Sequence, residues 1–376
     1  MRLPVRRRRL GLFLPLLAML ALPAAAPFTA AWAQERVINV YNWTDYIDPK
    51  AIGRFQAETG ITVRYDVFDS LETLEAKLSA GRSGYDVVVP TSEPTFARLV
   101  RAGALRRLDR AQIPNFANQD PALLQRVASS DPGNAHGAIY LWGTIGMGLR
   151  PDRIRALAPD APLDSLDLLL KPENAKRIAG CGIAFMDSGI DVIPSVLHWL
   201  GKDPNSGAAE DLAAAEKALL AIRPHVRAII SSGALADALA NGEYCAVFGY
   251  SGDVIQARVR AEAGGRADGL AYVQPKQGAQ LWFDMLAIPA DAPHPEDAQR
   301  FIDFLLRPEV IAGVTNQVRY PNAVPASRAH LSQAVLNDPN VIPTPEMIAR
   351  TFTVTAPPPA AERARARLWT RFKAGR

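Results

Sequence analysis

The alternation of apolar segments after the N-terminus constrains the fold of this chain most strongly. Residues 37–41, 61–67 and 85–89 have the short apolar patterns of strands, and the last, with three consecutive valines, is typical of a fully buried one. Two helical patterns lie between them, one from Asp48-Pro49 to Gly60 and one from Ser70 to Gly81, and each begins at a capping residue. This βαβαβ order predicts a parallel sheet with right-handed crossovers.

The first 33 residues have the features of a secretory signal peptide. A run of arginines is followed by an apolar stretch from Leu10 to Ala26 and by the cleavage pattern Ala31-Trp32-Ala33. Pro15 and Pro23 interrupt the apolar stretch, whereas a membrane anchor needs about 20 uninterrupted apolar residues. We therefore expect a periplasmic protein whose signal peptide is cleaved near Ala33. Both the general and the twin-arginine export pathways are compatible with this leader.

Removing the leader also removes the basic character of the chain. The sequence has 42 Lys and Arg against 38 Asp and Glu, and five of the arginines lie in the leader, which leaves 37 against 38. No basic block with interleaved aromatic residues remains, so nucleic acid is not an expected partner. The mature chain of about 340 residues exceeds what one hydrophobic core usually supports, so two lobes are expected.

The pattern of strands and helices suggests where the chain passes between these lobes. Regularity fades between residues 110 and 140, which we interpret as a crossing into the second lobe. Further strand patterns cover 138–142, 181–186, 244–249, 271–275 and 282–289, and helical patterns cover 192–200, 211–222, 235–241 and 295–306. The first lobe is expected to comprise residues 34–140 and 261–310, and the second lobe residues 141–260 and 311–376, which include the C-terminal helices.

No motif for catalysis or metal binding is complete. Gly249-Tyr-Ser-Gly-Asp253 lacks the final glycine of a nucleophile elbow, the five histidines are scattered, and no GK[ST] loop occurs. In an exported chain, Cys181 and Cys245 favour a disulfide over a metal site, with two free thiols as the alternative. We expect no cofactor, no metal and no enzymatic activity; a secreted hydrolase that uses its acids as general acid and base is a remote alternative.

Acidic residues recur beside aromatic ones near the ends of predicted strands. Asp45 lies between Trp43 and Tyr46, Tyr250 precedes Asp253, Trp282 precedes Asp284, and Tyr320 follows a helical segment. Each pair alone is equally typical of a turn or the rim of a core. Together they indicate a site for an organic cation, because carboxylates and aromatic faces both attract positive charge.

Seven segments resemble the periplasmic polyamine-binding proteins, which are the putrescine and spermidine receptors of ABC importers. The segments follow one order through the mature chain and are Val40–Ile47, Tyr65–Ser70, Tyr85–Pro90, Leu169–Asn174, Gly201–Asn205, Gly249–Val254 and Trp282–Pro289. The resemblance implies an α/β fold of the bilobal type II periplasmic-binding-protein class, with two α/β lobes joined by a strand-like hinge. The two cysteines of that family match Cys181 and Cys245.

The resemblance also implies a set of ligand-binding residues. These are the aromatic residues Trp43, Tyr46, Tyr250, Trp282 and Tyr320, the acids Asp191, Asp253 and Asp284, and the hydroxyl residues Thr44, Thr91 and Ser232. The family usually has Trp at position 250 and Glu at position 191, so the shorter Asp191 is expected to reach a ligand through water. Two roles stay open: Asp45 could position its loop or meet the ligand, and Glu93 could be a rim charge or an added amine partner.

The implied function is that of a monomeric periplasmic receptor. It would bind a polyamine, with putrescine favoured, in the cleft between the lobes and deliver it to the permease and ATPase of an ABC importer. Spermidine, agmatine or another cationic solute is an alternative ligand, and a ligand sensor is an alternative role. An amino acid would need an arginine for its carboxylate, for which Arg319 beside Tyr320 is the candidate.

Overall fold

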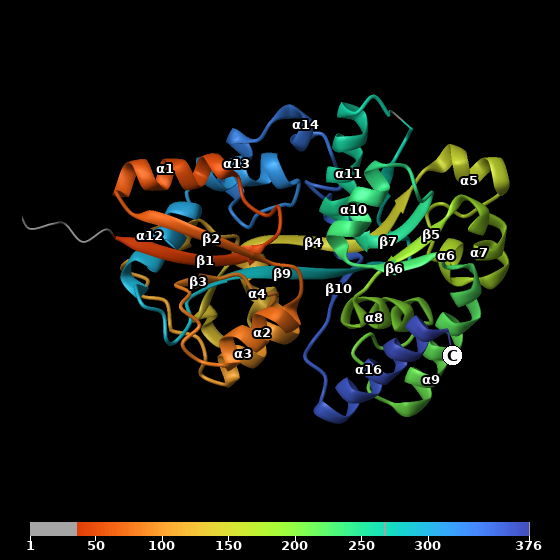
Figure 1. Cartoon of the computed structure of the whole chain (residues 1–376), viewed down its shortest axis with the longest axis horizontal. Coiled ribbons are helices and arrows are strands. Elements are labelled where there is room, and N and C mark those ends of the chain that lie inside the picture. The colour runs from red at the N-terminus through yellow and green to blue at the C-terminus, as the bar shows by residue number, and fades with distance from the viewer. Residues whose placement is uncertain (1–35, 267, 376) are drawn as a thin grey trace, which may run out of the picture. The chain divides into compact units, whose positions relative to one another are not determined.

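One mixed β-sheet organises the chain in the computed structural model, which describes residues 36–266 and 268–375. The signal peptide predicted for residues 1–33 lies outside these residues. The strands follow the order β2-β1-β3-β9-β4-β7-β5-β6, with β10 beside β9 and β8 beside β4 (Figure 1). Their bounds are β1 Val37–Trp43, β2 Thr62–Phe68, β3 Val87–Val88, β4 Gly137–Leu149, β5 Ile183–Met186, β6 Ala228–Ile230, β7 Ala246–Tyr250, β8 Ala271–Val273, β9 Ala279–Ala287 and β10 Thr351–Thr353.

The first half of the sheet has the parallel order predicted from the sequence. Strand β1 pairs in parallel with β2 on one side and with β3 on the other. The intervening helices begin at the predicted caps, because the Asp48 carboxylate accepts from the amide of Lys50 and the Ser70 hydroxyl accepts from the amide of Thr73. Gly60 ends the first helix in the left-handed conformation that favours glycine, with φ 67°.

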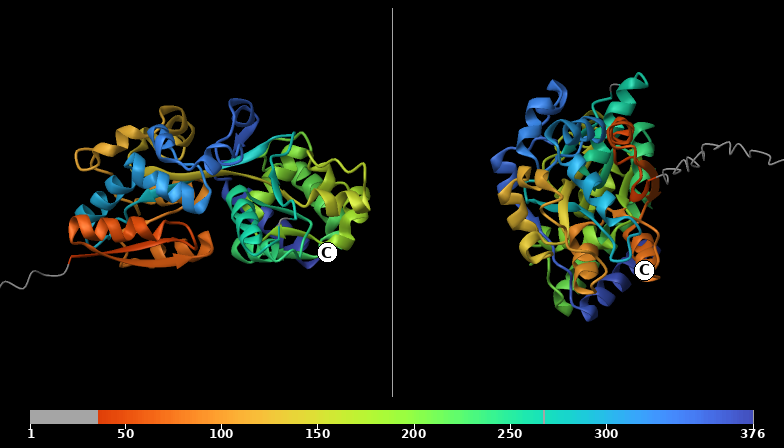
Figure 2. Two further views of the ribbon diagram at one scale, coloured as in Figure 1. Left: turned by 90° about the horizontal axis from the view of Figure 1, so that it is seen from above. Right: turned by 90° about the vertical axis from the view of Figure 1, so that its left-hand side faces the viewer.

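Strands β4 and β9 belong to both parts of the fold. Residues 137–144 of β4 pair with β9, and residues 145–149 of the same strand pair with β7. The second half of the sheet continues from β7 through the parallel strands β5 and β6. Figure 2 shows β4 running from one group of helices to the other, so a continuous strand connects the two halves.

Helices cover both faces of each half. In the first half α1 and α13 lie on one side of the sheet and α2 and α3 on the other, whereas in the second half α10 and α11 lie opposite α8 and α16 (Figure 1). The bounds are α1 Pro49–Thr59, α2 Leu71–Ser79, α3 Ala97–Arg101, α4 Pro121–Val127, α5 Pro151–Leu157, α6 Asp167–Leu170, α7 Pro172–Ile178, α8 Gly189–Trp199, α9 Ala209–Ile222, α10 Ser232–Ala240, α11 Ser251–Ala263, α12 Pro295–Leu305, α13 Pro308–Val318, α14 Gln333–Leu336, α15 Pro345–Ala349 and α16 Pro359–Ala374.

A disulfide joins Cys181 to Cys245, with 5.5 Å between their Cα atoms, and this confirms the predicted pairing. It ties the turn after α7 to the residue that precedes β7. No helix among residues 36–266 and 268–375 is long and apolar enough to cross a membrane.

The structure departs from the sequence prediction in several places. Residues 110–140, predicted to be irregular, contain α4 and short 3-10 turns. Strand β1 extends two residues beyond the predicted range 37–41 and ends at Trp43, and Trp282 and Asp284 lie inside β9 rather than at a strand end. The described residues 36–266 and 268–375 group into one compact unit, and the predicted lobe boundaries stay a prediction.

Candidate functional site

Four of the predicted aromatic residues form one connected chain of rings. The ring of Tyr320 lies 5.5 Å from that of Tyr46 and 5.2 Å from that of Trp282, which in turn lies 5.7 Å from that of Tyr250. All three contacts are edge to face, a geometry that aromatic rings prefer. The residues come from the turn after β1, the segment after α13, the middle of β9 and the end of β7, so tertiary folding brings them together.

Two glycines let these rings lie directly on the backbone. A Cβ atom at Gly252 would be 2.3 Å from the ring of Tyr320, and one at Gly143 would be 2.5 Å from the ring of Trp282. Any larger residue would displace the rings. The sequence around each glycine does not indicate this role, because the ring that occupies the space of the missing Cβ belongs to a residue far away in the chain.

Asp191 accepts three side-chain hydrogen bonds in the first turn of α8. Ser188 and Tyr250 donate to its Oδ2 over 2.6 Å each, and Gln280 donates to its Oδ1 over 2.7 Å. The carboxylate is buried, at 8% exposure. Burial raises its pKa, and the hydrogen bonds oppose this rise because they stabilise the charged form.

Asp253 is held in the first turn of α11. Tyr320 donates its hydroxyl to Oδ1 of Asp253 over 2.8 Å and accepts from the Asp253 amide over 3.1 Å, while Ser232 donates to Oδ2. Burial raises the pKa of Asp253, and the two hydroxyls lower it. The positive end of the helix favours a carboxylate at this position.

Asp284 lies in the middle of β9 and is 4% exposed. The Thr91 hydroxyl donates to its Oδ1 over 2.6 Å. Burial raises the pKa of Asp284 to about 7, the hydroxyls of Thr91 and Tyr46 oppose the rise, and the charge of Asp191 adds to it. Asp191 and Asp284 are therefore close enough to repel each other, and each is more easily ionised when a cation lies between them.

The three carboxylates have neutral partners only. Among the described residues no Lys, Arg or His forms an ion pair with Asp191, Asp253 or Asp284, and no His, Cys, Asp or Glu side chains are grouped to hold a metal ion. Arg260 lowers the pKa of Asp253 from a distance but forms its own ion pairs elsewhere. The site thus combines excess negative charge with aromatic walls.

Several buried polar atoms near the acids and rings have no hydrogen-bond partner in the described part of the chain. They are Oη of Tyr46, Nε1 of Trp282 and Oε1 of Gln280. Unpaired buried polar atoms are rare in folded proteins, and each marks a position where a ligand or water can bind.

Trp43 and Thr44 both contact Phe68, the last residue of β2. Trp43 is partly buried and packs against Phe68, with ring centres 4.5 Å apart, and Thr44 is exposed and donates to the Phe68 carbonyl over 3.4 Å. Their predicted contact with a ligand stays a prediction.

The two acids whose roles were open have protein partners. Asp45 is exposed and pairs with Arg260, 3.0 Å away. Both carboxylate oxygens of Glu93 accept hydrogen bonds over 2.8 Å, one from the Ser130 hydroxyl and one from the Ala356 amide.

Sequence reasoning missed Ser188 and Gln280. Ser188 occupies the N-cap position of α8, three residues before Asp191, and this spacing is typical of helix starts. Gln280, Trp282 and Asp284 are every second residue of β9, so their side chains share one face of the strand. Extending that alternation backwards would have identified Gln280.

Comparison with known proteins gives consistent matches over most of the chain. Residues 50–344 match the family described as bacterial extracellular solute-binding protein. The chain is 44% identical to the putrescine-binding periplasmic protein SpuD of Pseudomonas aeruginosa, over 96% of this chain and 98% of that one. It is 42% identical to the putrescine-binding periplasmic protein PotF of Escherichia coli, over 95% of this chain and 96% of the other.

A solved structure has the same fold. The spermidine/putrescine ABC transporter substrate-binding protein PotD of Streptococcus pneumoniae superimposes with a TM-score of 0.76 at 26% sequence identity. The match covers 90% of this chain and 99% of that one.

Proposed function

This chain belongs to the bacterial extracellular solute-binding proteins, among the periplasmic polyamine-binding proteins, and we propose that it binds putrescine and delivers it to an ABC importer. Its fold is the predicted α/β fold of the bilobal type II periplasmic-binding class. Its relatives are solute-binding transport proteins, and we propose that this chain likewise has no enzymatic activity.

One observation carries the proposal: three carboxylates that pair with no cation in the described residues surround a chain of aromatic rings. A diamine has an ammonium group at each end of an apolar methylene chain. Carboxylates can bind the ends, and aromatic faces can cover the middle, where each contact of a cation with a ring contributes about 0.5 to 2 kcal/mol.

The hydroxyl donors have a positioning role in this proposal. Ser188, Thr91 and Ser232 each donate to one acid and leave the remaining lone pairs for the ligand. Because the partners of the acids are hydroxyl, phenol and amide groups and not cations, an ammonium group need not displace a lysine or arginine. This arrangement makes the site selective for cations.

The connecting strands support a receptor that closes around its ligand. Strands β4 and β9 run between the two halves, and the site residues come from both. A ligand that contacts both halves favours the closed arrangement by its differential affinity for it. The closed form would then be recognised by the permease and ATPase of the importer, with the receptor acting as a monomer.

The alternatives differ in their expected ligands. Spermidine, agmatine or another cation would use the same acids, and a sensor would bind the same ligand without a permease. An amino acid is less favoured, because the charges that act on Arg319 are those of Arg258 and Asp338 and not those of the three acids. A hydrolase would have to turn over an amide or glycoside.

A thermal-shift panel of amines tests the proposal. Putrescine at about 100 times its dissociation constant should add about 2.7 kcal/mol to the free energy of unfolding. Cadaverine, agmatine and spermidine rank the alternatives, and arginine and glutamate serve as controls. No shift with any of the four amines would overturn the polyamine proposal.

A further inference from the structure

Helix α16 holds the turn that leads into Asp191. It packs beside α8, whose first turn carries this acid (Figure 1). Trp369 of α16 donates its Nε1 hydrogen to Oδ1 of Asp187 over 2.8 Å, and the ammonium group of Lys373 pairs with Oδ2 over 2.5 Å. Asp187 directly follows β5 and begins the turn into α8. Two residues of α16 therefore hold the carboxylate at the start of this turn.

Gly189, the first residue of α8, lets the ring of Trp369 lie directly on the same turn. A Cβ atom at Gly189 would be 2.7 Å from Cγ of Trp369. The neighbouring Ser188 donates its hydroxyl to Oδ2 of Asp191 over 2.6 Å, and its carbonyl accepts from the Asp191 amide over 3.3 Å. A displacement of the Trp369 ring would therefore shift the turn that orients the Asp191 carboxylate.

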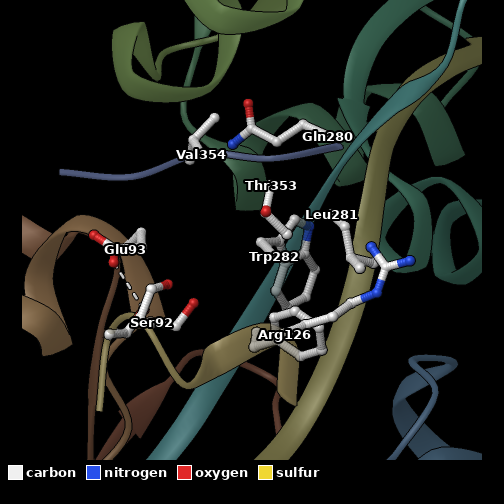
Figure 3. Close-up of a pocket in the computed structure, with 11 residues that line it drawn as sticks. Ser92, Glu93, Arg126, Gln280, Leu281, Trp282, Thr353 and Val354 are labelled. Atoms are coloured by element: carbon white, nitrogen blue, oxygen red, sulfur yellow. Dashed lines mark hydrogen bonds between the residues drawn. The ribbon is translucent and has the colours of Figure 1, made fainter. Parts of the chain in front are cut away.

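The segment before α16 contacts the strand that carries a second donor to this carboxylate. Strand β10 pairs with β9, and Phe352 lies opposite Gln280 in the register of the two strands. Figure 3 shows Gln280 beside Thr353 and Val354. Gln280 donates to Oδ1 of Asp191 over 2.7 Å. The C-terminal segment thus contacts the elements that carry two of the three side-chain donors to Asp191.

We propose that Trp369 is a positioning residue for Asp191, and that residues 351–374 stabilise this end of the ligand-binding site. The inference rests on the proposed function, because it presumes that Asp191 binds one ammonium group of a diamine. A carboxylate binds a cation well only when neighbouring groups hold its oxygens in the productive orientation. The oxygens of Asp191 are oriented by Ser188, whose turn Trp369 holds in place.

The test measures putrescine affinity by titration calorimetry in the wild-type protein and in two variants that disturb this contact. Trp369→Phe keeps an aromatic ring but removes the hydrogen bond to Asp187, and Gly189→Ala displaces the ring itself. Trp199→Phe is the matched control, because Trp199 at the other end of α8 donates its Nε1 hydrogen to Oδ1 of Asp167, also over 2.8 Å. Melting temperatures of the unliganded proteins verify folding.

The pKa of Asp191 in the unliganded proteins, followed by NMR of the side-chain carboxyl, is a second measurement. Burial raises this pKa, and the hydrogen bond from Ser188 opposes the rise. Trp369→Phe and Gly189→Ala should weaken that hydrogen bond and raise the pKa of Asp191 further. Trp199→Phe should leave it unchanged, because a general loss of stability does not alter the partners of Asp191.

We expect Trp369→Phe and Gly189→Ala each to weaken putrescine binding by about fivefold or more, and Trp199→Phe to keep the wild-type affinity. If both variants fold, bind putrescine within about twofold of wild type and keep the wild-type pKa of Asp191, the role of Trp369 is excluded and the proposed function stands. If the wild-type protein binds no putrescine, the proposed function fails, and the pKa of Asp191 still decides whether Trp369 positions this carboxyl group.

Discussion

Replacing Asp284 by asparagine should stabilise the unliganded protein and weaken ligand binding at the same time. Burial raises the pKa of Asp284 from 3.8 to about 7. A carboxyl whose pKa is higher in the folded state favours folding at low pH, and this stabilisation is lost as the pH rises through about 7. The asparagine side chain of the variant would stay neutral and would still accept from Thr91, so Asp284→Asn should avoid the loss.

The size of the stabilisation follows from the difference between the pKa of Asp284 in the unfolded and in the folded protein. Each pKa unit corresponds to about 1.4 kcal/mol. Asp284→Asn should therefore increase the free energy of unfolding by at most about 4 kcal/mol at pH 8 and about 2 kcal/mol at pH 5. At 4% exposure, solvent screens this carboxyl little. Binding should respond in the opposite direction, because stranding one buried charge of a pair costs about 3 to 5 kcal/mol, which is at least a hundredfold in dissociation constant.

Urea denaturation of the unliganded protein at both pH values, together with calorimetric titration of putrescine at pH 8, measures the two effects. Asp160→Asn is the control, since the Asp160 side chain is 75% exposed. The variant loses a surface ion pair with Arg177, which contributes about 0 to 1 kcal/mol, and should leave putrescine binding unchanged. The reasoning is refuted if Asp284→Asn is less stable than wild type at pH 8, or if its dissociation constant for putrescine stays within twofold.

The remaining predictions concern pH, packing and the disulfide. Putrescine affinity should fall about tenfold per pH unit below about 7, because binding must release the Asp284 proton. Calorimetry in two buffers of different ionisation enthalpy detects that proton. An affinity that is independent of pH from 5 to 8 would contradict this prediction. Gly252→Ala should weaken putrescine binding at least tenfold by displacing the Tyr320 ring, whereas Gly53→Ala on the exposed side of α1 should not, and equal affinities would exclude the packing argument. Cys181→Ala with Cys245→Ala should lower the free energy of unfolding by about 4 kcal/mol in the chain-entropy account, and unchanged denaturation midpoints would argue against it.

The sequence was sufficient to predict the parallel order of β1, β2 and β3, because their apolar runs and helix caps are local signals. The resemblance to a family named the four aromatic residues of the ring chain and the three acids. The structure brings the four rings into contact, and the binding of a ligand by these residues stays a prediction. The short strand β10 and its pairing with β9 had no such signal, since its neighbours lie about 70 residues away in the chain.

The environments of the acids depend on tertiary contacts that no local pattern encodes. Gln280 reaches Asp191 across 89 residues, and Arg260 reaches Asp45 across 215. The sequence left the role of Asp45 open, because the residue stands between two aromatic residues. Its backbone is left-handed, with φ 54°, and its exposed side chain pairs with Arg260. Asp253 accepts hydrogen bonds from Ser232 and Tyr320, and its contact with a ligand stays a prediction.

Calorimetric titration of putrescine into the wild-type protein and into Asp253→Ala tests the central claim most directly. The account predicts saturable one-to-one binding to wild type and none to Asp253→Ala, with both proteins folded by circular dichroism. Equal dissociation constants for the two proteins would contradict the assignment of the site.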